Sequence, residues 1–450
     1  MAGVNAGSGA PASQKFGLQT STAVVLSNII GVGVFTSLCF QIAEFRSGFV
    51  LLFLWLVGGV TALCGALTYA ELGARYPRSG GEYNYLREAV HPAMGLASGI
   101  VTILMGFGAP IALVAITFGE YLSSSLPGIS PFYAAIVVTI CGTSLHLFTY
   151  RTSSRSQSSV TYVKIGLIIL FCIACLVAVP NFQEISFVPT TNDVPLVFSG
   201  SFAVALVFVN YSYLGWNAVN YMSGDLRTDS NVLTHSLLIG TLIVCALYLF
   251  LNYTFLTVAP LDAMDGKIEI GIIVAREAFS EQGAMLMGIV LAISLIATIS
   301  AMVLAGSRVI HRVGEDESLF TFLAIRNKNH IPWVAVLLLA GVAFLFILTS
   351  TFRNILLYAG FALGISSFFT VLSIFVMRYR DKGKHTGYTM PWYPVPPIVF
   401  LVLMGGTLTY LLIEETRQSI FGALTYAAGA FIYYGLRFLD RFSATKPVKD

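Results

Sequence analysis

Long apolar stretches separated by short polar segments make up almost all of this chain of 450 residues. Each stretch is close to the ~20 residues that a helix needs to cross the hydrocarbon core of a bilayer. Strands of an outer-membrane barrel would alternate apolar and polar residues, and these stretches do not. The pattern predicts an all-α polytopic membrane protein whose twelve transmembrane helices cover residues 16–43, 48–75, 93–123, 131–149, 156–179, 196–223, 230–258, 282–312, 332–350, 353–378, 395–413 and 418–438.

The composition agrees with burial in a bilayer. Hydrophobic residues make up 56% of the chain and charged residues 10%, whereas soluble proteins carry roughly 25% charged residues. Of the 25 Lys and Arg residues, 19 fall on one side of the predicted helices, five on the other, and Lys164 inside a helix. By the positive-inside rule both termini are cytoplasmic, in a cell (inner or plasma) membrane. Topology accounts for the basic residues, so they do not indicate a nucleic-acid partner.

No linker or charge run divides the chain, so we predict one membrane domain. Residues 1–15 are rich in Gly, Ala and Ser, which predicts a disordered cytoplasmic tail without a removable signal peptide. A ten-helix core is expected over residues 16–390, and helices 11 and 12 over residues 391–440. Residues 441–450 are expected to form a second cytoplasmic tail.

The segment SNIIGVGVF, residues 27–35, interrupts the first predicted helix with two glycines. In a helix each glycine costs about 1 kcal/mol relative to alanine. A dinucleotide fingerprint would need a preceding strand and a soluble helix, so the membrane context excludes it. Two interpretations remain: the glycines provide a close helix contact, or they break the helix and expose its backbone to a ligand. The role of Asn28 stays open.

A second interruption, NYSYLGWN at residues 210–217, lies in the sixth predicted helix. If helices 11 and 12 are peripheral, the first and sixth helices begin two sets of five helices. Paired broken helices at corresponding positions of two halves mark the central site of many transporters. An odd number of helices in each repeat inverts the second copy, which brings both breaks near the bilayer midplane. This pairing favours the ligand interpretation of the glycines.

A broken helix leaves backbone N–H and C=O groups that need partners inside the bilayer. A zwitterionic solute supplies both kinds of partner. The N–H groups near Val32 and Gly33 would hold a carboxylate at the positive start of a half-helix. The carbonyls expected to accept from an ammonium are those of Ile29, Tyr211, Ser212 and Leu214.

Lys164 lies about nine residues into the fifth predicted helix, roughly 13 Å along its axis. A lysine could snorkel to the interface, but an ionisable group at this depth usually faces the bundle interior and has a function. It could remain a fixed cation, or it could gain and lose a proton. Tyr248 is a candidate for a hydrogen bond near it. Ser294 and Thr298 are more typical of helix contacts.

Tyr211 and Trp216 flank the second break, where they could be packing aromatics or rings of an occluding gate. All six cysteines fall in predicted helices, and Cys172-x-x-Cys175 has no nearby histidine, so no metal site or cofactor is expected. No nucleophile lies beside a base at a workable spacing, so the sequence does not indicate an enzyme. Residues 71–90 could form a solvated loop or a short helix over a cytoplasmic opening.

Five motifs occur in the order found in a known family. IIGVGVF, ELGARYPRSGGEYNY, YLGWNAVNY, LAGSRV and PWYPVPP resemble segments of the amino acid–polyamine–organocation superfamily, and within it of the L-type amino acid transporter group. The resemblance extends over most of the chain. It implies the leucine-transporter-type fold, a 5+5 inverted repeat with broken helices 1 and 6 and two further helices, which works by alternating access.

The same resemblance implies roles for individual residues at the two breaks. Gly31, Val32 and Gly33 match the substrate-carboxylate motif, although Val32 stands where the family usually has Ser or Thr. Tyr211 matches the position of an aromatic gate, and Asn217 matches a helix-six asparagine.

A second group of matching residues surrounds Lys164, which aligns with the lysine that replaces sodium in sodium-independent members. In that case its ammonium would bridge carbonyls around Ser27 and Ile30 to Thr298. Tyr248 matches a helix-seven tyrosine.

Residues and resemblance together predict sodium-independent transport of neutral L-amino acids, as an obligate exchanger. No acidic residue falls at the breaks to pair with a cationic side chain. A proton-coupled symporter of the same fold and a non-transporting amino-acid sensor remain alternatives. Besides the amino acid and the lipid bilayer, an accessory single-span subunit is expected only if the source is eukaryotic.

Overall fold

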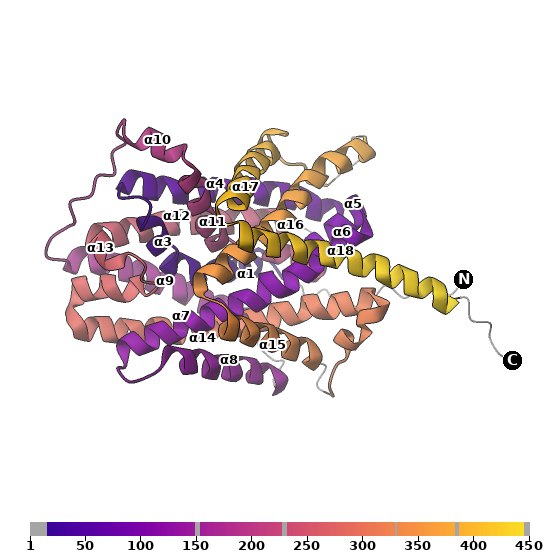
Figure 1. Cartoon of the computed structure of the whole chain (residues 1–450), viewed down its shortest axis with the longest axis horizontal. Coiled ribbons are helices and arrows are strands. Elements are labelled where there is room, and N and C mark those ends of the chain that lie inside the picture. Colours follow the sequence, from indigo (N-terminus) through magenta and orange to yellow (C-terminus); the bar gives the residue numbers. More distant parts are fainter. Residues whose placement is uncertain (1–15, 149–153, 227–231, 329–330, 383–386, 445–450) are drawn as a thin grey trace.

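The computed structural model describes residues 16–148, 154–226, 232–328, 331–382 and 387–444. These residues fold almost entirely into helices (Figure 1), and their one β-type contact is an isolated bridge between Phe16 and Leu226. The tail predicted over residues 1–15 lies outside the described residues. Of the second predicted tail, residues 441–444 belong to the last helix and the rest lies outside.

The first half of the chain forms the following elements. They are α1 (Leu18–Ile29), α2 (Gly33–Thr36), α3 (Leu38–Ile42), α4 (Gly48–Arg75), α5 (Glu82–Ala89), α6 (Pro92–Val101), the π-helical η2 (Thr102–Gly108), α7 (Ala109–Ser125), α8 (Pro131–Phe148) and α9 (Ser154–Ala178).

The second half continues in the same way. Its elements are α10 (Asp193–Val197), α11 (Gly200–Ser212), the 3-10 helix η3 (Ala218–Asp225), α12 (Val232–Val258), α13 (Leu261–Met264), α14 (Ile270–Asp316), the 3-10 helix η4 (Ser318–Ala324), α15 (Trp333–Thr349), α16 (Phe352–Asp381), α17 (Val395–Glu414) and α18 (Thr416–Ala444).

Nine helical stretches among the described residues are long and apolar enough to cross a membrane. Three shorter apolar helices, Pro131–Leu147, Gly200–Ser212 and Trp333–Thr349, accompany them. Each of the twelve predicted ranges overlaps one of these stretches. The chain is therefore a multi-pass α-helical membrane protein.

The largest difference from the predicted elements concerns α14, which begins at Ile270 rather than at residue 282. Its first part carries Arg276, Glu277 and Glu281, which lower the local hydropathy and hide the helix from the apolar pattern. Ser280 interrupts the helix with φ of 72° and ψ of 176°, so two helical pieces meet there. The short helices α10, α13 and η4 were not predicted. For residues 71–90 the sequence allowed a loop or a short helix, and the structure has the short helix α5 there.

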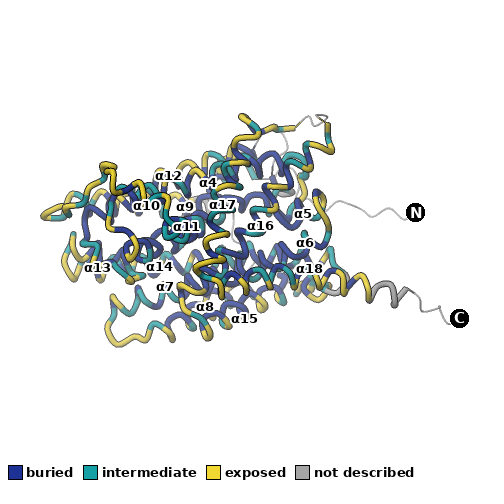
Figure 2. Tube along the Cα trace, turned by 45° about the horizontal axis from the view of Figure 1, so that its top comes forward, coloured by how far each residue is buried: buried dark blue, intermediate teal, exposed yellow. Residues whose placement is uncertain are grey.

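The elements are arranged so that α1 lies within the bundle, packed against α12 and α9 (Figure 1). The short helix α5 lies at one end of the molecule, and α10 and α13 lie at the opposite end. Buried residues concentrate on the inward sides of the helices and exposed ones on the periphery (Figure 2). A broken helix in this position is surrounded by other helices, so its free backbone groups depend on those helices or on groups in a cavity between them.

Candidate functional site

The first predicted break is present between α1 and α2. Regular helix stops at Ile29, Ile30 departs from helical geometry with ψ of 80°, and helix resumes at Gly33. The helix then continues from α2 into α3 because Ser37 keeps helical dihedral angles and its N–H bonds to Gly33 O. The start of this half-helix leaves N–H groups without an intrahelical acceptor.

The second break follows α11, which ends at Ser212. Gly215 has φ of 101°, a backbone conformation that L side chains rarely adopt, and η3 starts at Ala218. The two breaks touch each other. A Cβ atom added to Gly215 would lie 2.6 Å from the carbonyl oxygen of Asn28, so this glycine is also needed for close approach.

Gly31 and Gly33 serve different purposes at the first break. A Cβ atom on Gly33 would lie 2.6 Å from Ser212 Oγ and 2.8 Å from Ser212 Cα. A Cβ atom on Gly31 would meet only its neighbour Ile29 O, at 3.9 Å. Gly33 therefore permits a close helix contact, as the packing interpretation predicts, whereas Gly31 leaves open space beside the backbone.

Hydrogen bonds from side chains connect the ends of the two broken helices. The Tyr248 hydroxyl lies 2.7 Å from Ile29 O and 3.0 Å from Ser212 O, and its single proton can be donated to one of them at a time. Ser37 Oγ lies 2.9 Å from Ser212 Oγ and donates to Phe208 O at 3.2 Å. These contacts provide partners for carbonyls that the breaks release from helical bonding.

Lys164 reaches the first break from α9. Its Nζ donates to Ile30 O at 2.5 Å and to Thr298 Oγ1, on α14, at 3.4 Å. An ammonium at this point joins the broken helix to α14, and its charge is compensated here by oxygen dipoles. Among the described residues Lys164 Nζ does not bond to the Ser27 carbonyl, which was expected to accept from it, and the Ser27 hydroxyl donates to Val24 O at 3.0 Å within its own helix.

A cavity of about 100 Å³ lies beside the two breaks. This volume has room for several water-sized groups. All seven residues predicted to bind substrate line it: Ile29, Gly31, Val32, Gly33, Tyr211, Ser212 and Leu214. Asn28, whose role the sequence left open, also lines the cavity, while its amide donates to Val24 O at 2.8 Å.

The two predicted gate residues lie in different surroundings. Tyr211 is 8% exposed and lines the cavity. Trp216 lines a smaller neighbouring cavity and stands edge-on to Tyr69, with ring centroids 4.6 Å apart. Only Tyr211 is thus in a position to cover the main cavity in this conformation.

Glu82, at the start of α5, lines the cavity and was not predicted as a site residue. Its Oε1 accepts hydrogen bonds from Tyr69 at 2.6 Å, Ser367 at 3.1 Å and Asn217 at 3.2 Å, and its Oε2 accepts from Ser366 at 3.2 Å. Burial raises the pKa of this carboxyl above its ordinary value, while these four donors act to lower it. The breaks themselves carry no acidic residue, as expected, but the cavity does.

Aromatic rings cover the side of the breaks away from α5. Phe208 stacks on Phe40 with ring centroids 4.9 Å apart, and Phe40 stacks on Phe352 at 6.1 Å. The rings come from α11, α3 and α16. Apolar ring contacts therefore join α3, α11 and α16 close to the two breaks.

Multiple membrane-spanning helices with a central cavity at two adjoining helix breaks define the general class of this protein as a transporter-like membrane protein. Comparison with known proteins makes the class specific. The sequence profile of the amino acid permease family matches residues 16–435. The chain belongs to this family, which is part of the amino acid–polyamine–organocation superfamily.

Individual relatives are similar to this chain along most of its length. The serine/threonine exchanger SteT of Bacillus subtilis is 26% identical over 94% of this chain and 97% of its own. The b(0,+)-type amino acid transporter 1 of Mus musculus is 26% identical over 96% and 90%. The large neutral amino acids transporter small subunit 2 of the same species is 25% identical over 95% and 82%.

Proposed function

We propose that this protein is a sodium-independent exchanger of neutral L-amino acids that works by alternating access. The observation that carries the proposal is the bond from Lys164 Nζ to Ile30 O at the first break. A fixed ammonium there supplies the positive charge that a sodium ion would otherwise bring to the carbonyls of a broken helix. Names of the relatives, which include a serine/threonine exchanger, support amino acids as substrates and exchange as the mode.

The substrate site that we propose is made of backbone groups at the breaks. The N–H groups near Val32 and Gly33 would hold the carboxylate, since they stand at the start of the half-helix and line the cavity. The carbonyls of Ile29, Ser212 and Leu214 would accept from the ammonium. Ile29 O also accepts the Gly31 N–H at 2.7 Å, so it has a lone pair for the substrate when Tyr248 donates to Ser212 O instead.

Tyr211 is the proposed gate. Its ring lies at the cavity wall on the last turn of α11, so a small rotation of this half-helix would move it over a bound amino acid. The fold that we propose for these movements has twelve transmembrane helices, ten of them in a 5+5 inverted repeat. The excess of Lys and Arg on one side supports cytoplasmic termini.

Flux experiments in proteoliposomes test this function. Uptake of labelled neutral L-amino acids should require an unlabelled amino acid inside and should be unaffected when potassium replaces sodium. Uptake that ignores internal amino acid but follows a pH gradient would replace exchange with proton symport. Binding without flux would favour a sensor.

A further inference from the structure

Arg308 differs from the other charged residues around it on α14. It lines the cavity together with Met302, Ala305 and Val309 of the same helix. It makes no hydrogen bond or ion pair with any residue in the described parts of the chain. A guanidinium without a partner at the wall of a cavity is available to an anionic ligand.

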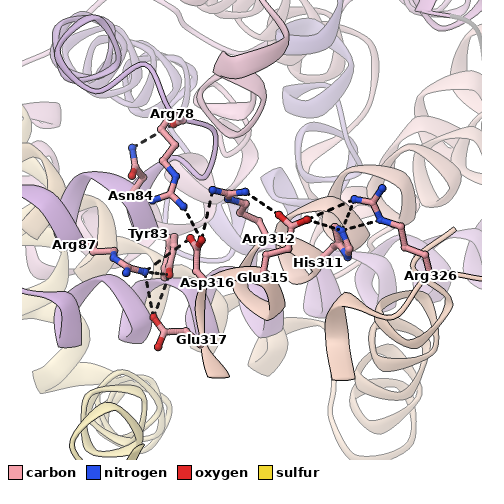
Figure 3. A network of polar contacts seen from close by, with 10 residues as sticks. All are labelled: Arg78, Tyr83, Asn84, Arg87, His311, Arg312, Glu315, Asp316, Glu317 and Arg326. Atoms are coloured by element: carbon pink, nitrogen blue, oxygen red, sulfur yellow. Dashed lines mark hydrogen bonds and ion pairs between the residues drawn. The ribbon is translucent and has the colours of Figure 1, made fainter. Parts of the chain in front are cut away.

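The neighbouring charges of α14 are engaged elsewhere. Arg312, one turn further along, bonds to Glu315 at 2.8 Å and lies 3.5 Å from Asp316. Asp316 also pairs with Arg78 at 2.6 Å, at the segment that leads into α5. Figure 3 shows this network, which holds α5 against the end of α14. Among the described residues neither Glu315 nor Asp316 forms an ion pair with Arg308.

Arg308 lies further along α14 than the residue of that helix that contacts Lys164. It lies ten residues beyond Thr298, which bonds to Lys164, and this separation is about 15 Å along the helix. Arg308 and the breaks line the same cavity, and Arg308 stands on the part of its wall that lies further along α14. Arg308 therefore belongs to the α5 end of the cavity, through which a substrate passes if that end opens.

A group of opposite charge lines the same cavity. Glu82 is 1% exposed, and its Oε2 accepts only the Ser366 hydroxyl, so it keeps acceptor capacity. Glu82 and Arg308 do not pair with each other. A cavity with one free cation and one carboxylate complements a zwitterion.

We propose that the α5 end of the cavity contains a second, transient subsite for an α-amino acid, in which Arg308 binds the carboxylate. The inference rests on the proposed amino-acid transport. It gives Arg308 a role on one face of the membrane only, since a substrate that enters from the other face reaches the breaks first.

The test varies substrate separately on the two faces of proteoliposomes that contain the full chain in one orientation. The probes are L-serine and L-leucine and their carboxamides, which lack the carboxylate. Arg308→Gln should raise the half-saturation concentration of the amino acids on the α5 face by roughly tenfold, as expected for the loss of one charge-assisted hydrogen bond. The half-saturation concentrations on the opposite face, and those of the carboxamides on either face, should not change. Arg308→Lys should restore part of the affinity.

Arg380→Gln is the control, because Arg380 is an exposed residue of α16 that does not line the cavity, so its replacement removes the same charge elsewhere. Equal effects of Arg308→Gln on both faces, or on acids and carboxamides alike, would overturn the subsite. A wild type that exchanges neither amino acid would refute the proposed function instead. Equilibrium binding of both amino acids would then test the subsite, and equal affinities of wild type and Arg308→Gln would reject it.

Discussion

Replacement of Gly33 by alanine tests whether the two helix breaks are held together by direct contact. The added methyl group would lie 2.6 Å from Ser212 Oγ, 2.8 Å from its Cα and 2.9 Å from its Cβ. Ordinary van der Waals contact begins at 3.4 Å, so the backbone at Ser212 would have to move by about 0.6 Å. Because a backbone atom is involved, rotation of the serine side chain alone cannot relieve the clash.

The expected cost follows from two opposing terms. Overpacking of a tight contact costs ~1–3 kcal/mol, and the backbone clash places Gly33→Ala in the upper part of that range. Alanine recovers about 1 kcal/mol through its better helix propensity. A net loss of about 1–2 kcal/mol remains. The same shift would lengthen the Tyr248 contact to Ser212 O, so substrate affinity should fall as well.

The assay combines thermal unfolding in detergent with amino-acid exchange in proteoliposomes. Gly33→Ala should lower the unfolding temperature and raise the half-saturation concentration by about tenfold. Gly31→Ala is the matched control, since its methyl group meets nothing closer than 3.9 Å and should leave stability unchanged. Adding Ser212→Gly should recover part of the loss, but not all, because the clash with the backbone at position 212 persists. If Gly31→Ala and Gly33→Ala lowered the unfolding temperature equally, the proposed contact between Gly33 and Ser212 would be refuted.

Three further predictions concern polar groups at the site. Lys164→Ala should reduce exchange at least tenfold, since the Ile30 carbonyl would lose its ammonium partner. Tyr248→Phe should raise the half-saturation concentration several-fold, because both break carbonyls lose their shared donor. Glu82 binds a proton more readily in the folded state, so unfolding temperature should fall as pH rises from 4.5 through its raised pKa. Glu82→Gln should remove the part of this pH dependence of the unfolding temperature that Glu82 causes.

Each of these three predictions would be contradicted by a different result. Unchanged rates and affinities of Lys164→Ala across pH would end its proposed role. Wild-type affinity in Tyr248→Phe would mean that other donors satisfy the carbonyls. A stability profile that is the same for wild type and Glu82→Gln would exclude Glu82 as the titrating group.

Much of the fold was predictable because the bilayer imposes a simple rule on the sequence: each helix that crosses it needs ~20 mostly apolar residues. Apolar runs located a helical stretch in each of the twelve ranges, and the two breaks were visible as glycines and polar residues where a helix should be apolar. The start of α14 was missed because Arg276 and Glu281 make that part too polar for the rule. Periodicity cannot recognise a helix that continues past a kink such as Ser280.

The cavity-lining residues at the breaks were predictable for a related reason, since helix interruptions expose backbone wherever they occur. Glu82 and Arg308 were not. A carboxylate in a loop segment usually faces water, and the sequence does not show that α5 begins with this side chain inside the bundle. Arg308 was counted among the basic residues of one side, where topology already explained it. Only the three-dimensional arrangement separates it from Arg312, whose partners lie 2.8 and 3.5 Å away.

Two different kinds of contact join the helices on the two sides of the breaks. At one end the rings of Phe40, Phe208 and Phe352 stack, and at the other the charges between α5 and α14 hold the elements together. Salt screens exposed charges, with a Debye length of about 3 Å at 1 M, and leaves ring stacking almost untouched. Ionic strength should therefore loosen the α5 end alone and act as a control over which side of the membrane the cavity faces.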